Sequence, residues 1–146
     1  MRCKLLDAGP PATYAVVLAK GDEVMRELGR IVREQKIEAA SITAIGAFER
    51  AVLGYFDWET KDYKRIPVAE QVEVLSLLGD VAVSDKGPTL HLHTVLGRSD
   101  GSTVGGHLLE GHVRPTLEIA LIEPPAHLRK RKDPETGLAL IDLQHS

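Results

Sequence analysis

The stretch of sequence that decides the fold is TLHLHTVLGRSDGSTVGGHLLEGHVRPTLE, residues 89–118. Two apolar runs in it are separated by Gly97-Arg98-Ser99-Asp100-Gly101, a composition typical of a tight turn. This arrangement predicts a β-hairpin. The stretch also holds four of the six histidines in the chain, so we expect the functional site there.

His91 and His93 are two residues apart, so on a β-strand their side chains point to the same face of the sheet. Whether His107, in the second strand, joins them depends on the turn. A two-residue loop at Asp100-Gly101 sends His107 to the opposite face. A three-residue loop, Ser99-Asp100-Gly101, has the glycine that its last position requires and places His107 directly opposite His93. The sequence permits both turns.

With the three-residue loop, three imidazoles come within reach of one metal ion, since directly opposite Cβ atoms lie roughly 4.5–5.5 Å apart. Neutral imidazole suits zinc and other late first-row ions, and three protein ligands leave a position for water or a ligand. His91, His93 and His107 are therefore the candidate ligands of a divalent ion, with zinc as the expected metal. The alternative is that the histidines pack separately in a polar-faced sheet. A cupin-type site is disfavoured, because it needs a glutamate where Val95 to Arg98 stand.

Length and composition limit the class of protein. A chain of 146 residues, 43% apolar and 27% charged, predicts one soluble globular domain spanning residues 1–146. Its net charge of −3 does not favour a polyanion-binding surface. The single cysteine excludes an intrachain disulfide and a Cys/His zinc finger. Because no stretch is apolar enough for a membrane span or a signal peptide, we expect a cytoplasmic protein without a membrane partner.

The remaining pattern predicts one helix among many strands. Asp22 is a candidate N-cap, and from there to Lys36 apolar residues recur on one helical face. A turn or bulge is expected at residues 46–49, and a turn at residues 110–111. The chain is thus expected to be an α+β domain with a central, mostly antiparallel β-sheet flanked by one or two helices. Besides the strand of His91 and His93, strands are predicted over residues 14–19, 39–45, 50–58, 63–66, 71–83 (one long or two short), 103–109, 113–122 and 138–143.

Phosphate-binding signals are weak. The chain contains neither the GxGxxG nor the GxxxxGK[ST] pattern of nucleotide sites. Arg129 to Lys132 are four consecutive basic residues, and such a run can contact a phosphate backbone. No aromatic residue interleaves them, so we interpret the run as a solvated loop between two strands.

Five segments of the chain are similar to a known family: SITAIGAF (41–48), LGYFD (53–57), VEVLSLLGD (72–80), HLHTVLGRSDGSTVGGHLLEGHV (91–113) and TLEIAL (116–121). On these segments the chain resembles the plants-and-prokaryotes-conserved (PPC) domain in its stand-alone prokaryotic form. That family's fold is a compact α+β domain with a central antiparallel sheet, and the resemblance implies a homotrimer. It also implies a metal site, typically zinc, formed by the HxH pair and the GGH histidine, here His91, His93 and His107.

In plants the domain follows AT-hook motifs in nuclear proteins that bind AT-rich DNA, and there it mediates self-association and partner binding. The plant signature GRFEIL aligns with EQVEVL, residues 70–75, and matches only in its second half. The AT-hook core RGRP is absent from this chain. The resemblance therefore supports self-association more strongly than DNA binding.

Three functions follow from these observations, in decreasing order of support. The first is a homotrimeric regulatory or ligand-binding module whose metal helps hold a small anionic or carbonyl-containing molecule. The second is a DNA-binding protein. The third is a metal-dependent enzyme with an open three-histidine site, for which Asp100, Glu110 and Glu118 are candidate general bases. The ligand, any catalysis, and the roles of Glu110, Glu118, His112 and the run from Arg129 to Lys132 stay open.

Overall fold

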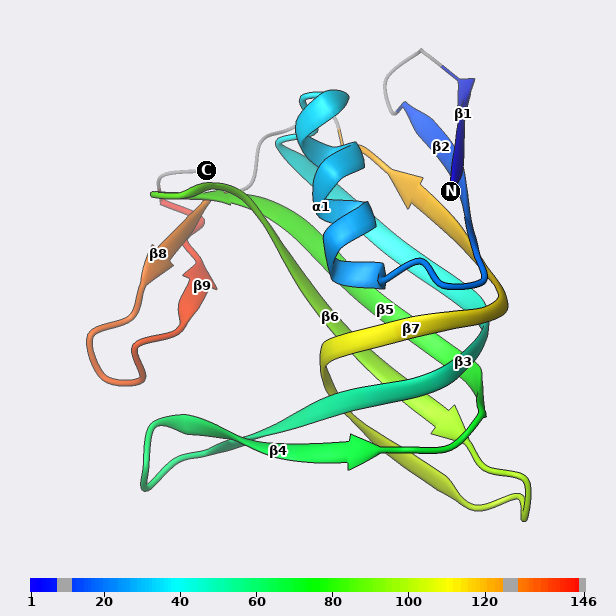
Figure 1. The fold of residues 1–146 in the computed structure, drawn as a ribbon. Helices are drawn as coiled ribbons and strands as arrows, with labels where there is room; N and C mark the ends of the chain where they lie inside the picture. The colour runs from blue at the N-terminus through cyan, green and yellow to red at the C-terminus, as the bar shows by residue number, and fades with distance from the viewer. Residues whose placement is uncertain (8–11, 125–128, 145–146) are drawn as a thin grey trace.

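An antiparallel β-sheet of seven strands dominates this computed structural model, which describes residues 1–7, 12–124 and 129–144 (Figure 1). The strand order is β1-β2-β7-β6-β5-β3-β4, and a separate pair, β8 and β9, forms a small second sheet. The elements are β1 (Arg2–Asp7), β2 (Thr13–Ala19), α1 (Val24–Glu34), β3 (Ala39–Asp57), β4 (Asp62–Val68), β5 (Val72–Ser84), β6 (Gly87–Gly97), β7 (Thr103–Ile122), β8 (Lys130–Lys132) and β9 (Ala139–Ile141).

The predicted central antiparallel sheet is confirmed, but the fold is largely β. The described residues contain one helix, α1, of 11 residues, which lies across one face of the sheet (Figure 1). No helix in the described part of the chain has the length and apolar character needed to cross a membrane.

Helix α1 buries the apolar face that the sequence predicts. The side chains of Val24, Leu28, Ile31 and Val32 are buried, and they pack in one core with apolar residues of the strands. The predicted N-cap is wrong, however. The carboxylate of Glu23, rather than that of Asp22, accepts hydrogen bonds from the first-turn amides, because Asp22 is engaged by the amide of Ala19 and by the N-terminal amino group.

Strands β3 and β7 are each continuous where the sequence predicted two strands and a turn. Residues 46–49, where a turn or bulge was expected, form a bulge within β3. The turn expected at residues 110–111 is a position within β7, because β3 and β7 pair with each other from Ser41↔Ile122 to Gly54↔His107. Shifts of register bend the pair near the predicted turns. Gly46 is required at one bend, since its φ is +153° and a Cβ there would lie 2.3 Å from the carbonyl oxygen of Thr116.

Four strands close on themselves. β3 pairs with β5, β5 with β6, β6 with β7, and β7 returns to β3. In this ring of pairings none of the four strands is a free edge, and β1 and β4 end the seven-stranded order.

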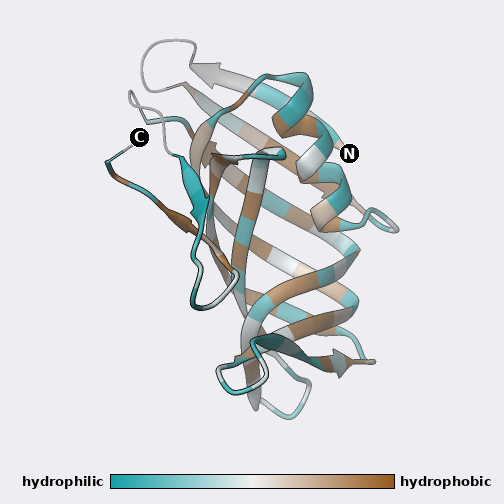
Figure 2. Cartoon of the chain, turned by 90° about the vertical axis from the view of Figure 1, so that its left-hand side faces the viewer, coloured by the Kyte–Doolittle hydropathy of each residue, from teal (hydrophilic) through white to brown (hydrophobic). Residues whose placement is uncertain are grey.

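The two faces of the sheet differ in what covers them. Hydrophobic and hydrophilic residues alternate along the strands (Figure 2), and one apolar set lies under α1. On the other strand face, large apolar side chains are exposed. We call this set the outer apolar face: Ile45, Leu75, Leu78, Val95 and Ile122, which are 63%, 54%, 55%, 42% and 41% exposed.

The basic run is not the solvated loop that the sequence predicted. Residues 130–132 form β8, which pairs with β9, and Arg129 forms an isolated bridge with Val83 of β5. Arg129, Arg131 and Lys132 are exposed, whereas Lys130 is buried. The hairpin of β8 and β9 therefore docks on the main sheet at the end of β5.

Candidate metal centre

The β6–β7 hairpin has the three-residue loop. Gly101 adopts a φ of +82°, and its amide donates to the carbonyl of Arg98 at 3.0 Å. The amide of Arg98 in turn donates to the carbonyl of Ser102 at 2.8 Å, which leaves Ser99, Asp100 and Gly101 as the loop. This turn sets the register so that His93 lies directly opposite His107. Of the two turns that the sequence permits, the structure has the three-residue loop, so His107 shares a face with His93.

The three histidines converge on one point. The Nε2 atoms of His91 and His93 are 3.1 Å apart. The ring centroids are separated by 5.0 Å for His91 and His93, 5.2 Å for His91 and His107, and 5.3 Å for His93 and His107. One nitrogen from each ring lies within 4.8 Å of the others. A single ion can therefore contact all three rings.

Two of the rings are held neutral by their surroundings. Burial, together with the nearby charges of His91, His93 and Lys130, lowers the pKa of His107 from 6.5 to about 4. Burial and the neighbouring His91 also lower the pKa of His93. A neutral imidazole keeps the lone pair that binds a metal, so at neutral pH both rings are competent ligands.

Aromatic contacts fix the ring of His107. Tyr63 of β4 stacks on it with ring centroids 4.7 Å apart and an angle of 25°, and Phe56 packs edge-on against Tyr63 at 5.4 Å. Burial raises the pKa of Tyr63, so its phenol stays neutral. Among the described residues, Nδ1 of His107 is buried without a hydrogen-bond partner. Buried polar atoms are rarely left unpaired, so this nitrogen lacks a partner that an ion or a water would supply.

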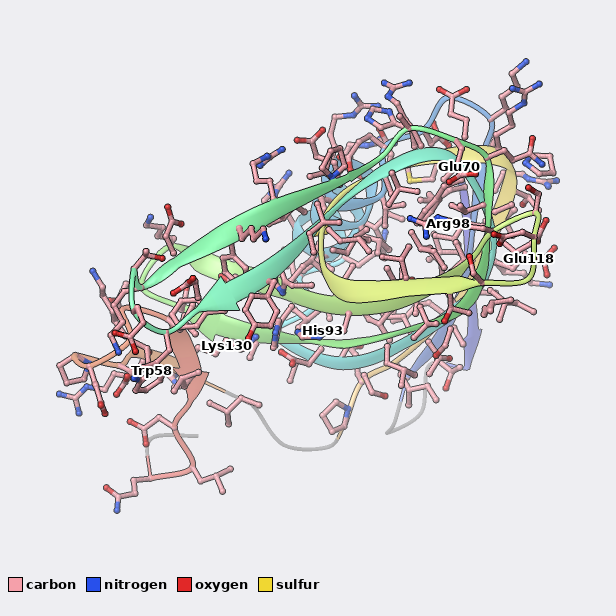
Figure 3. The ribbon with its side chains drawn as sticks, turned by 90° about the horizontal axis from the view of Figure 1, so that it is seen from below. Trp58, Glu70, His93, Arg98, Glu118 and Lys130 are labelled. Carbon is pink, nitrogen blue, oxygen red and sulfur yellow. The ribbon has the colours of Figure 1, made fainter. Side chains whose placement is uncertain are left out.

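One carboxylate belongs to the site. Asp80 of β5 is the cross-strand partner of His91, and its Oδ2 lies 3.5 Å from Nδ1 of that ring. Its Oδ1 forms an ion pair with Nζ of Lys130. Burial alone would raise the pKa of Asp80, but hydrogen bonds from His91 and Lys130 outweigh it and lower the pKa, so Asp80 is ionised. In Figure 3 Lys130 is labelled next to His93, near the centre of the molecule.

The candidate general bases lie elsewhere. Asp100 is in the hairpin loop, where its carboxylate accepts from the amide and hydroxyl of Ser102. Glu110 is paired with Arg65. Glu118 lies at the right-hand side of the molecule in Figure 3, away from His93 near the centre. None of these three carboxylates belongs to the metal-binding cluster found among the described residues.

His112, whose role the sequence left open, also lies outside that cluster. It contacts the guanidinium of Arg50 at 3.2 Å. The sequence did not connect Asp80, Tyr63 or Lys130 with the three histidines. Period-two alternation in β5 was the available signal for Asp80, but it needs the β5–β6 register to point to His91. No local pattern connects Lys130 with the histidines.

With this geometry established, comparison with known proteins identifies the family. The model of the Plants and Prokaryotes Conserved (PCC) domain matches residues 7–124. The chain belongs to this family. We keep the abbreviation PPC for it below.

Solved structures of other PPC-like proteins have the same fold. A plant- and prokaryote-conserved protein from Pyrococcus horikoshii is 33% identical, covers 94% of this chain and 97% of its own, and superposes with a TM-score of 0.84. A metal-containing protein from Archaeoglobus fulgidus is also 33% identical, with 96% of each chain covered and a TM-score of 0.82. A candidate DNA-binding protein from Bacteroides thetaiotaomicron is 28% identical, covers 97% and 98%, and has a TM-score of 0.89.

Among curated proteins, the chain matches two much longer relatives. These are bifunctional GlmU proteins from two Synechococcus strains, 31% and 32% identical over 141 and 142 residues. The match covers 92% and 95% of this chain but 21% and 22% of those proteins, so the chain spans about a fifth of their length.

Proposed function

We propose that this PPC-family chain is a metal-binding module in which His91, His93 and His107 hold one divalent ion, with zinc as the first candidate. The observation that carries the proposal is the convergence of three imidazoles from two paired strands, with one nitrogen from each ring within 4.8 Å of the others. Three nitrogen ligands of this kind suit zinc and its late first-row neighbours.

Two features of the site fit an ion. Nδ1 of His107 is buried and lacks a partner among the described residues, and the lowered pKa values of His93 and His107 keep both rings unprotonated at neutral pH. The Archaeoglobus relative, described as metal-containing, provides independent support.

The chemistry of such a site is that of an open Lewis acid. Three protein ligands leave a coordination position for a carboxylate, a carbonyl oxygen or water. The carboxylate at the centre, Asp80, is engaged by His91 and Lys130. A carboxylate held in this way is suited to orienting the metal ligand His91 rather than to abstracting a proton from a substrate. Binding of a small anionic or carbonyl-containing molecule is therefore favoured over catalysis.

We further propose that the module is a homotrimer. The outer apolar face is an exposed set of side chains on strands β3, β5, β6 and β7, whereas α1 covers the other face. Exposed apolar patches of this kind mark interaction sites. A second and third copy of the same chain are the partners that the family resemblance implies.

DNA binding is the second candidate, since the Bacteroides relative is described in those terms. In this chain the basic run would be the contact, with Arg131 and Lys132 exposed. Lys130 is buried in an ion pair and the net charge is −3, so the run offers less than four free charges to a phosphate backbone.

Metal analysis of protein purified without chelator tests the first proposal. We expect one equivalent of zinc or another late first-row ion per chain. A triple variant with His91, His93 and His107 replaced by alanine should contain none, whereas His112→Ala, a matched histidine variant outside the cluster, should keep it. Wild-type protein without any bound transition metal, even after incubation with zinc, would contradict the proposal.

A further inference from the structure

The buried lysine of the C-terminal hairpin is the starting point. The side chain of Lys130 is 3% exposed, and it comes from β8, outside the residues 7–124 that match the family model. Burying an ammonium group costs free energy unless it is paired. Its partner is Asp80, which also faces the metal ligand His91. Lys130, which lies outside the segment that matches the family, is therefore buried and is connected to the candidate metal ligand His91 through Asp80.

We infer that Lys130 is a positioning residue of the metal centre, which acts through Asp80 to fix the ring of His91 with its Nε2 directed at the metal position. The inference rests on the proposed metal site. It names a residue, and with it the hairpin of β8 and β9, that controls how that site is built.

Each carboxylate oxygen of Asp80 contacts a different side chain. Oδ1 pairs with Nζ of Lys130, and Oδ2 lies 3.5 Å from Nδ1 of His91, at the long limit for a hydrogen bond. With one oxygen held by the lysine, the carboxylate presents the other to the imidazole. A carboxylate opposite Nδ1 favours the tautomer that carries its proton there.

The other nitrogen of the ring is the one placed for coordination. Nε2 of His91 lies 3.1 Å from Nε2 of His93. When Nδ1 of His91 carries the proton, this Nε2 has a free lone pair. A carboxylate behind a coordinating histidine also makes the ring a better donor, and removal of such a partner weakens metal binding by roughly 10- to 100-fold.

Whether metal binding becomes tighter or weaker when Lys130 is replaced distinguishes a positioning role from a direct electrostatic effect. Lys130 is positively charged and close enough to His107 to lower the pKa of that ring. If its charge acted directly on a bound cation, removing the charge would tighten metal binding. If Lys130 acts by holding Asp80, removing it frees the carboxylate to turn away and weakens metal binding. The two mechanisms predict opposite changes.

A purely architectural role is the remaining alternative. The ion pair ties the hairpin of β8 and β9 to β5, alongside the Val83↔Arg129 bridge. In that case Lys130→Met would lower the stability of the hairpin and leave the state of His91 unchanged. The tautomer of His91 in metal-free protein is therefore a readout that architecture alone does not move.

The experiment compares Lys130→Met with Lys132→Met, an exposed lysine of the same strand. Zinc affinity is measured by chelator competition, and the His91 tautomer by long-range proton–nitrogen correlation spectra of metal-free protein. We expect wild type and Lys132→Met to agree, with the proton on Nδ1. We expect Lys130→Met to bind zinc roughly 10- to 100-fold more weakly and to show a mixture of tautomers.

Lys130→Met alone leaves the Asp80 carboxylate without its partner and can destabilise the fold. The double variant Asp80→Asn/Lys130→Met avoids this problem, because it removes both charges and leaves neither buried alone. If Lys130 acts through Asp80, its replacement should have little further effect on zinc affinity once Asp80 is Asn. Zinc affinity of Lys130→Met equal to or tighter than that of wild type would overturn the inference. So would an unchanged His91 tautomer, and because that spectrum needs no metal, it decides the inference even if wild type fails to bind zinc and the proposed function falls.

Discussion

The proposed metal position depends most on His107, the one candidate ligand that reaches it across the hairpin. His91 and His93 share a strand, whereas His107 is brought opposite them by the register of β6 and β7 and is fixed by the stacked ring of Tyr63. With His107 removed, two imidazoles remain, and zinc sites with two protein ligands are weak.

His107→Ala is therefore expected to lower zinc affinity by at least about 100-fold, since one of three ligands is lost. Tyr63→Leu should weaken binding less, because it removes the ring contact and leaves the ligand. Isothermal titration with zinc provides the measurement, with His112→Ala as the control. Equal affinities for His107→Ala and His112→Ala would show that His107 is no ligand.

Acid should lower the stability of the metal-free fold through His107. Above pH 6.5 the ring of His107 is neutral in the folded and the unfolded chain alike. Between pH 6.5 and about 4 the His107 ring is protonated in the unfolded chain but stays neutral in the folded chain, because burial lowers the pKa of His107 to about 4. The metal-free fold therefore loses stability as the pH falls through this window, and no further loss from this group occurs below it.

Protons compete with the metal for the same rings, so bound zinc after dialysis should fall across a range at or below the ordinary histidine pKa of about 6.5. Full retention at pH 4 would indicate carboxylate or backbone ligands instead. Loss of helical and sheet circular dichroism in parallel would show that release follows from unfolding, which the same samples can distinguish.

At the residue scale the sequence predicted the three histidines and missed their support. HxH spacing and a glycine at the last loop position are local patterns, so they predict which side chains share a face. Asp80 reaches His91 through the β5–β6 register, and Lys130 reaches Asp80 only after the C-terminal hairpin docks. Such contacts between distant segments have no local signature.

At the scale of the elements, replacing Gly101 or Gly46 with alanine has two different costs: backbone strain at Gly101 and a steric clash at Gly46. Gly101 has a φ of +82°, and a Cβ added there would meet nothing within 4 Å, so alanine costs only the left-handed backbone conformation, about 1–2 kcal/mol. At Gly46 a Cβ would lie 2.3 Å from the backbone oxygen of Thr116. Backbone atoms of β7 cannot move aside without breaking the β3–β7 pairing.

We therefore expect Gly46→Ala to destabilise the chain more than Gly101→Ala, whose zinc binding should be unchanged. Urea unfolding followed by circular dichroism gives both free energies. Equal losses would show that β7 shifts to accommodate the methyl group.

The same bends explain where the predicted elements failed. At residues 46–49 the expected turn or bulge is a bulge, whereas the local signal for a turn at residues 110–111 is overridden by the long mutual pairing of β3 and β7. The α1 face was predictable because its spacing repeats within one segment. The identity of the N-cap was not, because Asp22 is occupied by contacts with Ala19 and the N-terminus.

For the whole molecule, the outer apolar face predicts self-association. Light scattering at micromolar concentration should give three times the chain mass of 15.9 kDa. Leu78→Lys, placed on the exposed face beside His93, should shift the mass towards the monomer, because it puts a charge into an apolar contact. Glu34→Lys, on the outer side of α1, is the matched control. A wild-type mass of one chain would refute the trimer.

Whole-molecule charge predicts weak DNA binding. With −3 per chain, any attraction should come from the exposed Arg131 and Lys132 with Arg129, and it should fall steeply as salt rises. Replacing these three with glutamine should abolish it in a fluorescence anisotropy titration. A specific complex tighter than about 10⁻⁸ M at physiological salt, insensitive to these replacements, would show base readout by another surface.

The closed ring of β3, β5, β6 and β7 has a consequence for how the molecule forms in time. The hairpin that carries His91, His93 and His107 pairs residues close in sequence, whereas the ring closes by pairing Ser41 with Ile122. Local hairpins form in about 1–10 μs, and pairings between distant segments pay a larger entropy of loop closure and form later. The three imidazoles thus meet before the barrel-like ring is shut, and because His91 and His93 stay partly or fully exposed in the finished fold, an ion can enter the site both before and after the ring closes.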